Sequence, residues 1–243
     1  MRANIASTPV PEQASLRASS FPADERAAIE AITKDYLLQH PEVIREAFAE
    51  LDKRQRAAEA EQHWGAIKEN AAAIFSSPHQ VVLGNPQGDA TLVEFFDYNR
   101  PHCRNTLPAL LDLLKTDLNL KVVLKELPVL GNASVEAAQV AIAVRMQDET
   151  GAKYLEFHRR LLGGHGLADR ARALAVAKDV GLDMARLNRD LESPEVKAMI
   201  EETGKLAEAT GITGTPSYVI GNEIVVGEAD LEILKQKIAL ARR

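Results

Sequence analysis

The sequence predicts an α/β protein in which a helical segment precedes a mixed domain of strands and helices. Three observations support this prediction. Apolar residues recur at helical spacing from Asp24 onward, strand-like apolar runs then alternate with helical patterns, and two more strand-like runs follow a long helical block. Of the 243 residues, 46% are hydrophobic and 26% are charged, which is a globular composition with enough length for one substantial core and an appendage.

The composition also excludes several classes of function. The net charge is -6 and the basic residues are dispersed, so we expect no nucleic-acid partner. No run of about 18 apolar residues exists, so we expect no membrane span. One cysteine rules out an internal disulfide, the six histidines lack metal-ligand spacing, and no glycine-rich phosphate loop occurs. We therefore expect neither a metal nor a cofactor.

The N-terminal part divides into a leader and a helical segment. Residues 1–23 are rich in Pro, Ser and Ala, which predicts a disordered leader, and they lack the apolar region of a signal peptide. Residues 24–75 carry apolar stripes at both ends of a polar stretch at 52–62, with a helix interruption at 40–42. Such a helix cannot bury its apolar stripes by itself, so it must pack against another part of the protein or against another copy of the chain. We predict self-association into a dimer or trimer through 24–75; docking on the globular domain and a mobile arm are the alternatives.

The mixed domain is predicted for residues 76–243, after a Pro/Gly-rich boundary at 76–89. Strand 91–96, helix 103–117 and strand 121–127 form a βαβ unit with a parallel pair. A helical block spans about 133–211, with breaks at 163–166, 180–183 and 192–195. A hairpin of strands 217–221 and 223–227 and a last helix at 229–241 follow. This order predicts a thioredoxin fold with a helical insertion.

The stretch "DYNRPHC", residues 97–103, lies between the first strand and its helix, where a redox turn of the C-x-x-C type would lie. In such a turn the first thiol sits at the helix N-terminus, where unpaired N–H groups and the helix dipole stabilise its thiolate. The second thiol, one turn further on, resolves the mixed disulfide. Only the second position holds a cysteine in this chain.

Four separated motifs in the same order carry a family resemblance: "IEAITKDYLLQHPEV", "VEFFDYNRPHC", "KELPVLG" and "GITGTPSYVIG". Together they resemble the DsbA-like thiol–disulfide oxidoreductases, and most of all the ScsC/Com1-type group with its N-terminal helical oligomerisation segment. The resemblance covers about residues 25–240. It implies thiol–disulfide exchange with extended or unfolded protein substrates and a periplasmic or otherwise extracytoplasmic location. A cytoplasmic location is the alternative, since no signal peptide is visible.

The chain departs from the family motif D-Y-x-C-P-x-C at its most important position. Arg100 stands where the attacking cysteine belongs, Pro101 and His102 follow, and Cys103 takes the resolving position. We therefore expect dithiol oxidase activity to be lost. Either Cys103 performs monothiol chemistry with proteins or small thiols, its thiolate favoured by Arg100 and His102, or it is a shielded, inert thiol. Arg100 reflects either drift, at a cost of about 0.3–1 kcal/mol, or binding of an anion.

Three more residues take roles from the resemblance. Glu94 resembles the buried acid beneath the redox turn, with Lys125 as its candidate partner on the neighbouring strand; an exposed strand charge is the alternative. Thr215 and Pro216 resemble the cis-proline edge that binds an extended peptide, and an ordinary trans proline on an edge strand is the alternative. The predicted function is that of a DsbA-family homologue without dithiol oxidation, and the alternative is a redox-inactive peptide-binding chaperone or adaptor.

Overall fold

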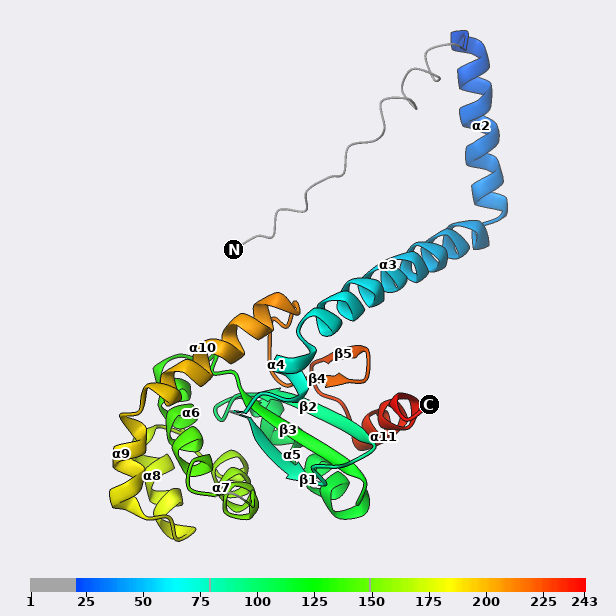
Figure 1. The fold of residues 1–243 in the computed structure, drawn as a ribbon. Helices are drawn as coiled ribbons and strands as arrows, with labels where there is room; N and C mark the ends of the chain where they lie inside the picture. Colours follow the sequence, from blue (N-terminus) through cyan, green and yellow to red (C-terminus); the bar gives the residue numbers. More distant parts are fainter. Residues whose placement is uncertain (1–20, 79, 149) are drawn as a thin grey trace. The chain divides into compact units, whose positions relative to one another are not determined.

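The computed structural model describes residues 21–78, 80–148 and 150–243 (Figure 1). Residues 1–20 of the predicted leader therefore lie outside the described residues. The contacts divide the chain into two compact units, which meet between Ala58 and Glu59. Each unit is described by itself.

The first unit consists of helix α2 (Ala23–Gln39) and the first part of helix α3 (Glu42–Glu69). The predicted interruption at 40–42 is confirmed, with Pro41 directly before the new helix, where a missing N–H costs least. No residue of α2 is buried, and Ile32 and Phe48 are 69% and 63% exposed. Apolar side chains of α2 and α3 line a shared groove: Ile29, Leu37, Leu38 and Ile44.

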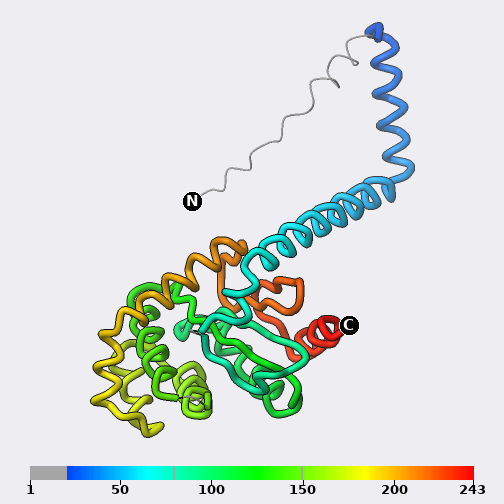
Figure 2. The backbone as a smooth tube through the Cα atoms, in the orientation of Figure 1, coloured from blue at the N-terminus to red at the C-terminus, as the bar shows by residue number. Residues whose placement is uncertain are grey.

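The second unit contains a sheet of five strands within the described residues, in the order β1-β3-β2-β4-β5. The strands are β1 (Val81–Gly84), β2 (Ala90–Phe96), β3 (Leu120–Glu126), β4 (Ser217–Ile220) and β5 (Glu223–Val226). Only β2 and β3 run parallel, joined by a helical crossover, and the other neighbouring strands are antiparallel. Figure 2 shows the chain returning after the helical block to place β4 beside β2.

Alternating side chains of the central strands bury both faces of the sheet, which is why β2 and β3 read as nearly continuous apolar runs. Leu92 and Phe96 belong to a core shared with α5 (Pro101–Thr116), α6 (Asn132–Arg145), α7 (Ala152–Gly163) and α11 (Leu231–Ala241). Val93 and Phe95 pack on the other face against α3, α4 (Ala71–Phe75) and α10 (Pro194–Ala209). Helices α8 (Arg170–Asp179) and α9 (Met184–Leu191) complete the insertion.

The predicted thioredoxin fold with a helical insertion is confirmed, and three details differ from the sequence reading. Strand β1 lies inside the stretch at 76–89 that was predicted to be only a boundary. A further break separates α6 from α7, where Asp148 accepts a hydrogen bond from Tyr154 N. Ile67 and Ile74, in the predicted N-terminal segment, are buried in the core of the second unit.

Candidate functional site

The turn between β2 and α5 is built around Arg100. Pro101 is the first residue of α5, a position where the ring fixes a helical φ and no N–H is missed. Arg100 is the N-cap residue, in an extended conformation, and its carbonyl accepts hydrogen bonds from Cys103 N at 3.1 Å and Arg104 N at 3.2 Å. These bonds place Cys103 in the first turn of the helix, with its side chain directed into the core.

Asp97 fixes the start of the turn to the loop that follows β3. Its Oδ1 accepts a hydrogen bond from Asn99 N at 2.8 Å. Its Oδ2 accepts from Val129 N at 2.7 Å and from Leu130 N at 3.0 Å. A carboxylate with three N–H donors satisfies its charge without a cation. Sequence reasoning gave Asp97 no role, although its place directly after a buried strand is typical of a residue that orders a turn.

Asn99 fixes the same turn to the helical insertion. Its Oδ1 accepts from Ala168 N at 2.8 Å, and its Nδ2 donates to Ala168 O at 2.9 Å and to Ser134 Oγ at 3.1 Å. The side chain therefore pairs with the backbone of Ala168 as a neighbouring strand would. No local pattern could reveal this contact, because its partners lie 35 and 69 residues away in the chain.

The sulfur of Cys103 is fully buried, at 0% exposure. The pKa of the thiol is raised from 9.0 to about 12, chiefly by burial and to a smaller extent by the nearby carboxyls of Glu94 and Asp97. The Asp97 backbone and the Thr215 hydroxyl oppose this rise but do not overcome it. The structure therefore shows Cys103 as a buried thiol, while its inertness stays a prediction. Neither Arg100 nor His102 is among the main influences on its pKa.

Arg100 and His102, the neighbours of the thiol in the turn, differ in their exposure. His102 is exposed, and its Nδ1 pairs with Glu228 Oε1 in the loop between β5 and α11. Asn105 Nδ2 donates to the same oxygen at 3.0 Å. The hydrogen bonds from His102 and Asn105 lower the pKa of Glu228. Arg100 is half-buried, and its Nε has no hydrogen-bond partner among the described residues.

Glu94 lies beneath the turn, 3% exposed, as the resemblance implies. Burial raises its pKa to about 8, and the hydroxyl of Tyr218 donates a long hydrogen bond to Oε1 at 3.5 Å. The expected pairing with Lys125 is wrong. Glu94 is opposite Leu124 in the parallel ladder, while Lys125 is opposite Phe95 and so lies on the other face of the sheet. Lys125 Nζ instead donates to Gln80 Oε1 at 3.4 Å.

Thr215 and Pro216 directly precede β4 and are joined by a cis peptide bond, as expected. Both are buried, and the Thr215 hydroxyl lies close enough to Cys103 to act on the pKa of its thiol. Pro216 O accepts a hydrogen bond from Gly227 N at 2.9 Å. The structure thus brings Glu94, Cys103 and Thr215 together, which the sequence alone could only suggest.

A buried polar network that the sequence analysis missed supports the turn from behind. The hydroxyl of Tyr98 lies 3.3 Å from Tyr154 Oη and 3.3 Å from His158 Nδ1. Tyr154 donates to Glu126 Oε1 at 2.5 Å. Burial raises the pKa of Glu126 and lowers that of His158 to about 3. Burial thus disfavours the charged form of both groups, and the imidazole of His158 is neutral at neutral pH.

The described residues also bear on metal binding and on membrane crossing. They contain no group of three or more His, Cys, Asp or Glu side chains arranged to hold a metal ion. None of their helices combines the length and the apolar character that crossing a membrane requires.

Solved structures of known proteins resemble this chain along most of its length. A thioredoxin-like oxidoreductase from Silicibacter pomeroyi is 42% identical, with a TM-score of 0.66, and the match covers 70% of this chain and 96% of that one. The thiol-disulfide exchange protein alpha-DsbA2 from Wolbachia pipientis is 29% identical, with a TM-score of 0.70 over 75% and 97% of the two chains. Proteus mirabilis ScsC, 24% identical with a TM-score of 0.67 over 91% and 99%, shares the fold.

Curated relatives match over shorter parts of their own length. The thiol:disulfide interchange protein DsbA of Bordetella pertussis is 29% identical, and the match covers 55% of this chain and 64% of DsbA. The Na(+)/H(+) antiporter NhaA 1 of Salinispora arenicola is 28% identical over 66% of this chain, but the chain spans only 24% of the antiporter.

Two parts of the chain match two known domain families, and these parts correspond closely to the two units of the fold. Residues 25–58 match the copper resistance protein ScsC N-terminal domain. Residues 91–239, more than half of the chain, match the DSBA-like thioredoxin domain. The protein therefore belongs to the DsbA-like family of thioredoxin-fold proteins.

Proposed function

We propose that this chain is a peptide-binding member of the DsbA-like family that has given up dithiol exchange. The observation that carries the proposal is the state of its single thiol. Donating a disulfide requires two sulfurs in one site, and only Cys103 is present. With a pKa raised to about 12 and no exposed surface, this thiol offers almost no thiolate at neutral pH.

Peptide capture is supported by what surrounds the turn. Asp97 and Asn99 hold two loops against it, and these loops expose the apolar side chains of Val129, Leu130 and Leu167. A separate groove of about 650 Å³ runs between α5 and the start of α11, where Pro108, Ala109, Ala229, Leu231 and Ile233 line it together with polar side chains such as Asn105, Asp112 and Glu228. Apolar surface of this kind suits the exposed hydrophobic side chains of extended or unfolded proteins.

The second candidate function is monothiol exchange with a protein or a small thiol. It requires a reactive sulfur at the site. The sulfur would have to reach solvent and lose its proton near neutral pH. Reaching solvent would require the first turn of α5 to open, because Cys103 packs in the main core of the second unit. The geometry of the closed turn favours the binding function over this one.

Alkylation of the thiol separates the two functions. For the peptide binder, iodoacetamide at neutral pH should modify Cys103 only as fast as the protein unfolds, so that denaturant accelerates labelling strongly. Fast labelling of the folded protein, with an apparent pKa near neutrality, would establish the monothiol function instead. An assay of the oxidation of a reduced unfolded protein should give no turnover.

Restoring the missing thiol tests the scaffold itself. The Arg100→Cys variant should form a disulfide with Cys103 and gain oxidase or reductase activity, because position 100 is the N-cap of α5. Arg100→Ser is the matched control, since it removes the arginine without supplying a sulfur. A folded Arg100→Cys protein that forms no disulfide would show that the two positions are not arranged as a redox pair.

The assembly and the compartment complete the proposal. Residues 24–75 would associate copies of the chain into a dimer or trimer, which would cover the apolar side chains exposed on α2 and α3. The match of residues 25–58 to the ScsC N-terminal domain supports this assembly. A periplasmic or otherwise extracytoplasmic site of action follows the resemblance to DsbA-like proteins, and cell fractionation of the native protein would test it.

A further inference from the structure

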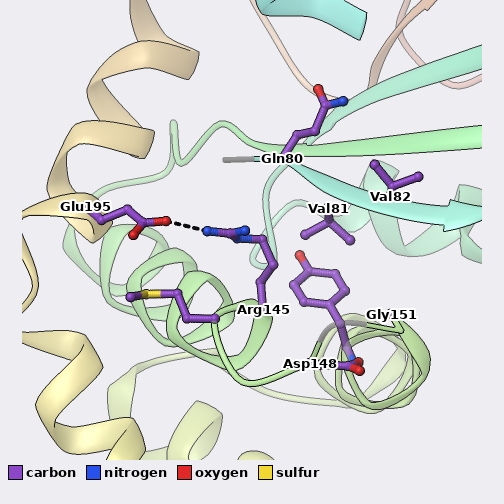
Figure 3. Close-up of a pocket in the computed structure, with 9 residues that line it drawn as sticks. Gln80, Val81, Val82, Arg145, Asp148, Gly151 and Glu195 are labelled. Atoms are coloured by element: carbon purple, nitrogen blue, oxygen red, sulfur yellow. Dashed lines mark hydrogen bonds and ion pairs between the residues drawn. The ribbon is translucent and has the colours of Figure 1, made fainter. Parts of the chain in front are cut away.

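The side chain of Arg100 carries a charge that the rest of the chain does not balance. The residue is half-buried, its Nε is buried without a partner, and its guanidinium forms no ion pair with a described residue. Arg145, whose Nε also lacks a partner, differs because its Nη2 donates to Glu195 Oε1 at 2.5 Å in the wall of a cavity of about 420 Å³ (Figure 3). A partly buried cation without a counterion costs free energy, which an anion from outside the chain would recover.

The carboxyl groups around the turn are not available to Arg100. Asp97 accepts hydrogen bonds from three backbone N–H groups, and Glu228, in the loop after β5, pairs with His102. Burial raises the pKa of Glu94 to about 8, so this carboxyl is mainly protonated at neutral pH. The site therefore supplies a cation without supplying its anion.

The start of α5 favours negative charge at the same place. Pro101 has no N–H, and the carbonyl of Arg100 accepts from Cys103 N and Arg104 N. The N–H of His102 has no acceptor within the helix, since that acceptor would precede α5, and no described residue accepts from it. The helix dipole adds partial positive charge at this end. An anion beside Arg100 would meet both the guanidinium and a free N–H.

The strand end beside the turn has unused hydrogen-bonding groups of its own. Ser217 is opposite Phe95 in the ladder of β4 and β2, so Thr215 lies beside the end of β2, where the turn begins. Thr215 is 3% exposed, yet its Oγ1, its N–H and its carbonyl have no hydrogen-bond partner among the described residues. An extended segment that paired with Thr215 would pass the start of α5.

We propose that Arg100 binds a carboxylate of an extended client segment held along Thr215, an inference that rests on the proposed peptide-binding function. A guanidinium presents paired N–H donors that match the two oxygens of a carboxylate. One cation suits a singly charged carboxylate better than a phosphate, because Arg104 Nε donates to the carbonyl of Leu162 at 2.9 Å and His102 has its own partner. An ion pair thus replaces the mixed disulfide that a thiol at position 100 would form.

The experiment uses the full chain, isothermal titration calorimetry and three acetylated pentapeptides of threonine and valine around one central residue. The first has a central glutamate and an amidated end, the second a central glutamine and an amidated end, and the third a central glutamine and a free C-terminal carboxylate. The wild type should bind the first about tenfold more tightly than the second, and about 0.5 M salt should reduce this preference to about threefold or less.

The third peptide distinguishes the two sources of the carboxylate. An affinity like that of the glutamate peptide would show that the chain end of a client also fits Arg100. An affinity like that of the amidated glutamine peptide would restrict the site to acidic side chains.

Variants of single arginines make the result decisive. Arg100→Gln should bind all three peptides as weakly as the wild type binds the amidated glutamine peptide, and Arg100→Lys should keep only part of the preference, since it retains the charge without the paired donors. Arg189→Gln removes an exposed arginine of α9 and should keep the full preference.

Two results would overturn the carboxylate site while leaving peptide capture in place. One is equal affinity of the wild type for all three peptides, and the other is a preference that persists in the folded Arg100→Gln protein. Absence of binding to every peptide would overturn the proposed function together with this inference.

Discussion

Replacing Glu94 with glutamine should stabilise this protein at neutral and alkaline pH. The carboxyl is 3% exposed, and one of its oxygens, Oε2, has no hydrogen-bond partner among the described residues. Burial raises its pKa from 4.5 to about 8, so the folded protein keeps a proton that the unfolded chain releases. Between these two pH values the unfolded state binds fewer protons, and the free energy of unfolding of the wild type falls as the pH rises.

The magnitude follows from the two pKa values. At 1.36 kcal/mol per pH unit, the interval from 4.5 to about 8 corresponds to about 5 kcal/mol, which is an upper value because a buried site relaxes when it ionises. Glutamine is neutral in both states and avoids this loss. The stability difference between variant and wild type should therefore be near zero at pH 4.5, grow up to about pH 8 and stay constant above it.

Urea unfolding followed by circular dichroism, at pH values from about 5 to about 9, measures this difference. With a slope of about 2 kcal/mol per molar urea, the full effect would move the unfolding midpoint by about 2.5 M. Burial also lowers the pKa of His158 from 6.5 to about 3, so both proteins lose stability as the pH falls below 6.5. Because this loss is the same in both, the difference between their stability-versus-pH curves reports on Glu94 alone. Glu228→Gln is the control, because the pKa of that exposed carboxyl is lowered. Parallel curves for Glu94→Gln and the wild type would refute the reasoning.

Three further predictions concern stability and assembly. Asn99→Ala removes the bonds to Ser134 and Ala168 and should lower the free energy of unfolding in urea by about 1–3 kcal/mol; an unchanged midpoint would contradict the role of this side chain. His158→Phe should resist acid better, because the folded wild type must protonate a buried imidazole as the pH falls from 6.5 toward about 3, and acid titration by circular dichroism would detect the lower midpoint. Ile32→Asp combined with Phe48→Asp should reduce the particle mass in light scattering to that of one chain, whereas Lys53→Asp, in the polar stretch, should not. An unchanged mass in the double variant would place the assembly contacts elsewhere.

The order of elements was predictable because it depends on local patterns. Neighbouring residues in the sequence are enough to indicate the apolar runs of β2 and β3 and the glycine-rich ends of the insertion helices. The helix that carries Cys103 follows from the same local information, although it begins at Pro101, two residues earlier than predicted. By contrast, β1 has only four residues and is held by pairing with β3, which comes later in the chain, so no local pattern identifies it.

The sequence by itself determined that dithiol exchange lacks one of its two sulfurs, since that requires only a count and a spacing. The burial of the remaining thiol was decided by the tertiary structure, because Cys103 lies in a core built from elements that are distant in the chain, and this burial raises the pKa of the thiol. The same holds for Glu94 and Lys125, which neighbouring strands carry to opposite faces of the sheet. Covalent order fixes which groups exist, while solvent exclusion and strand register fix which of them meet and in what charge state.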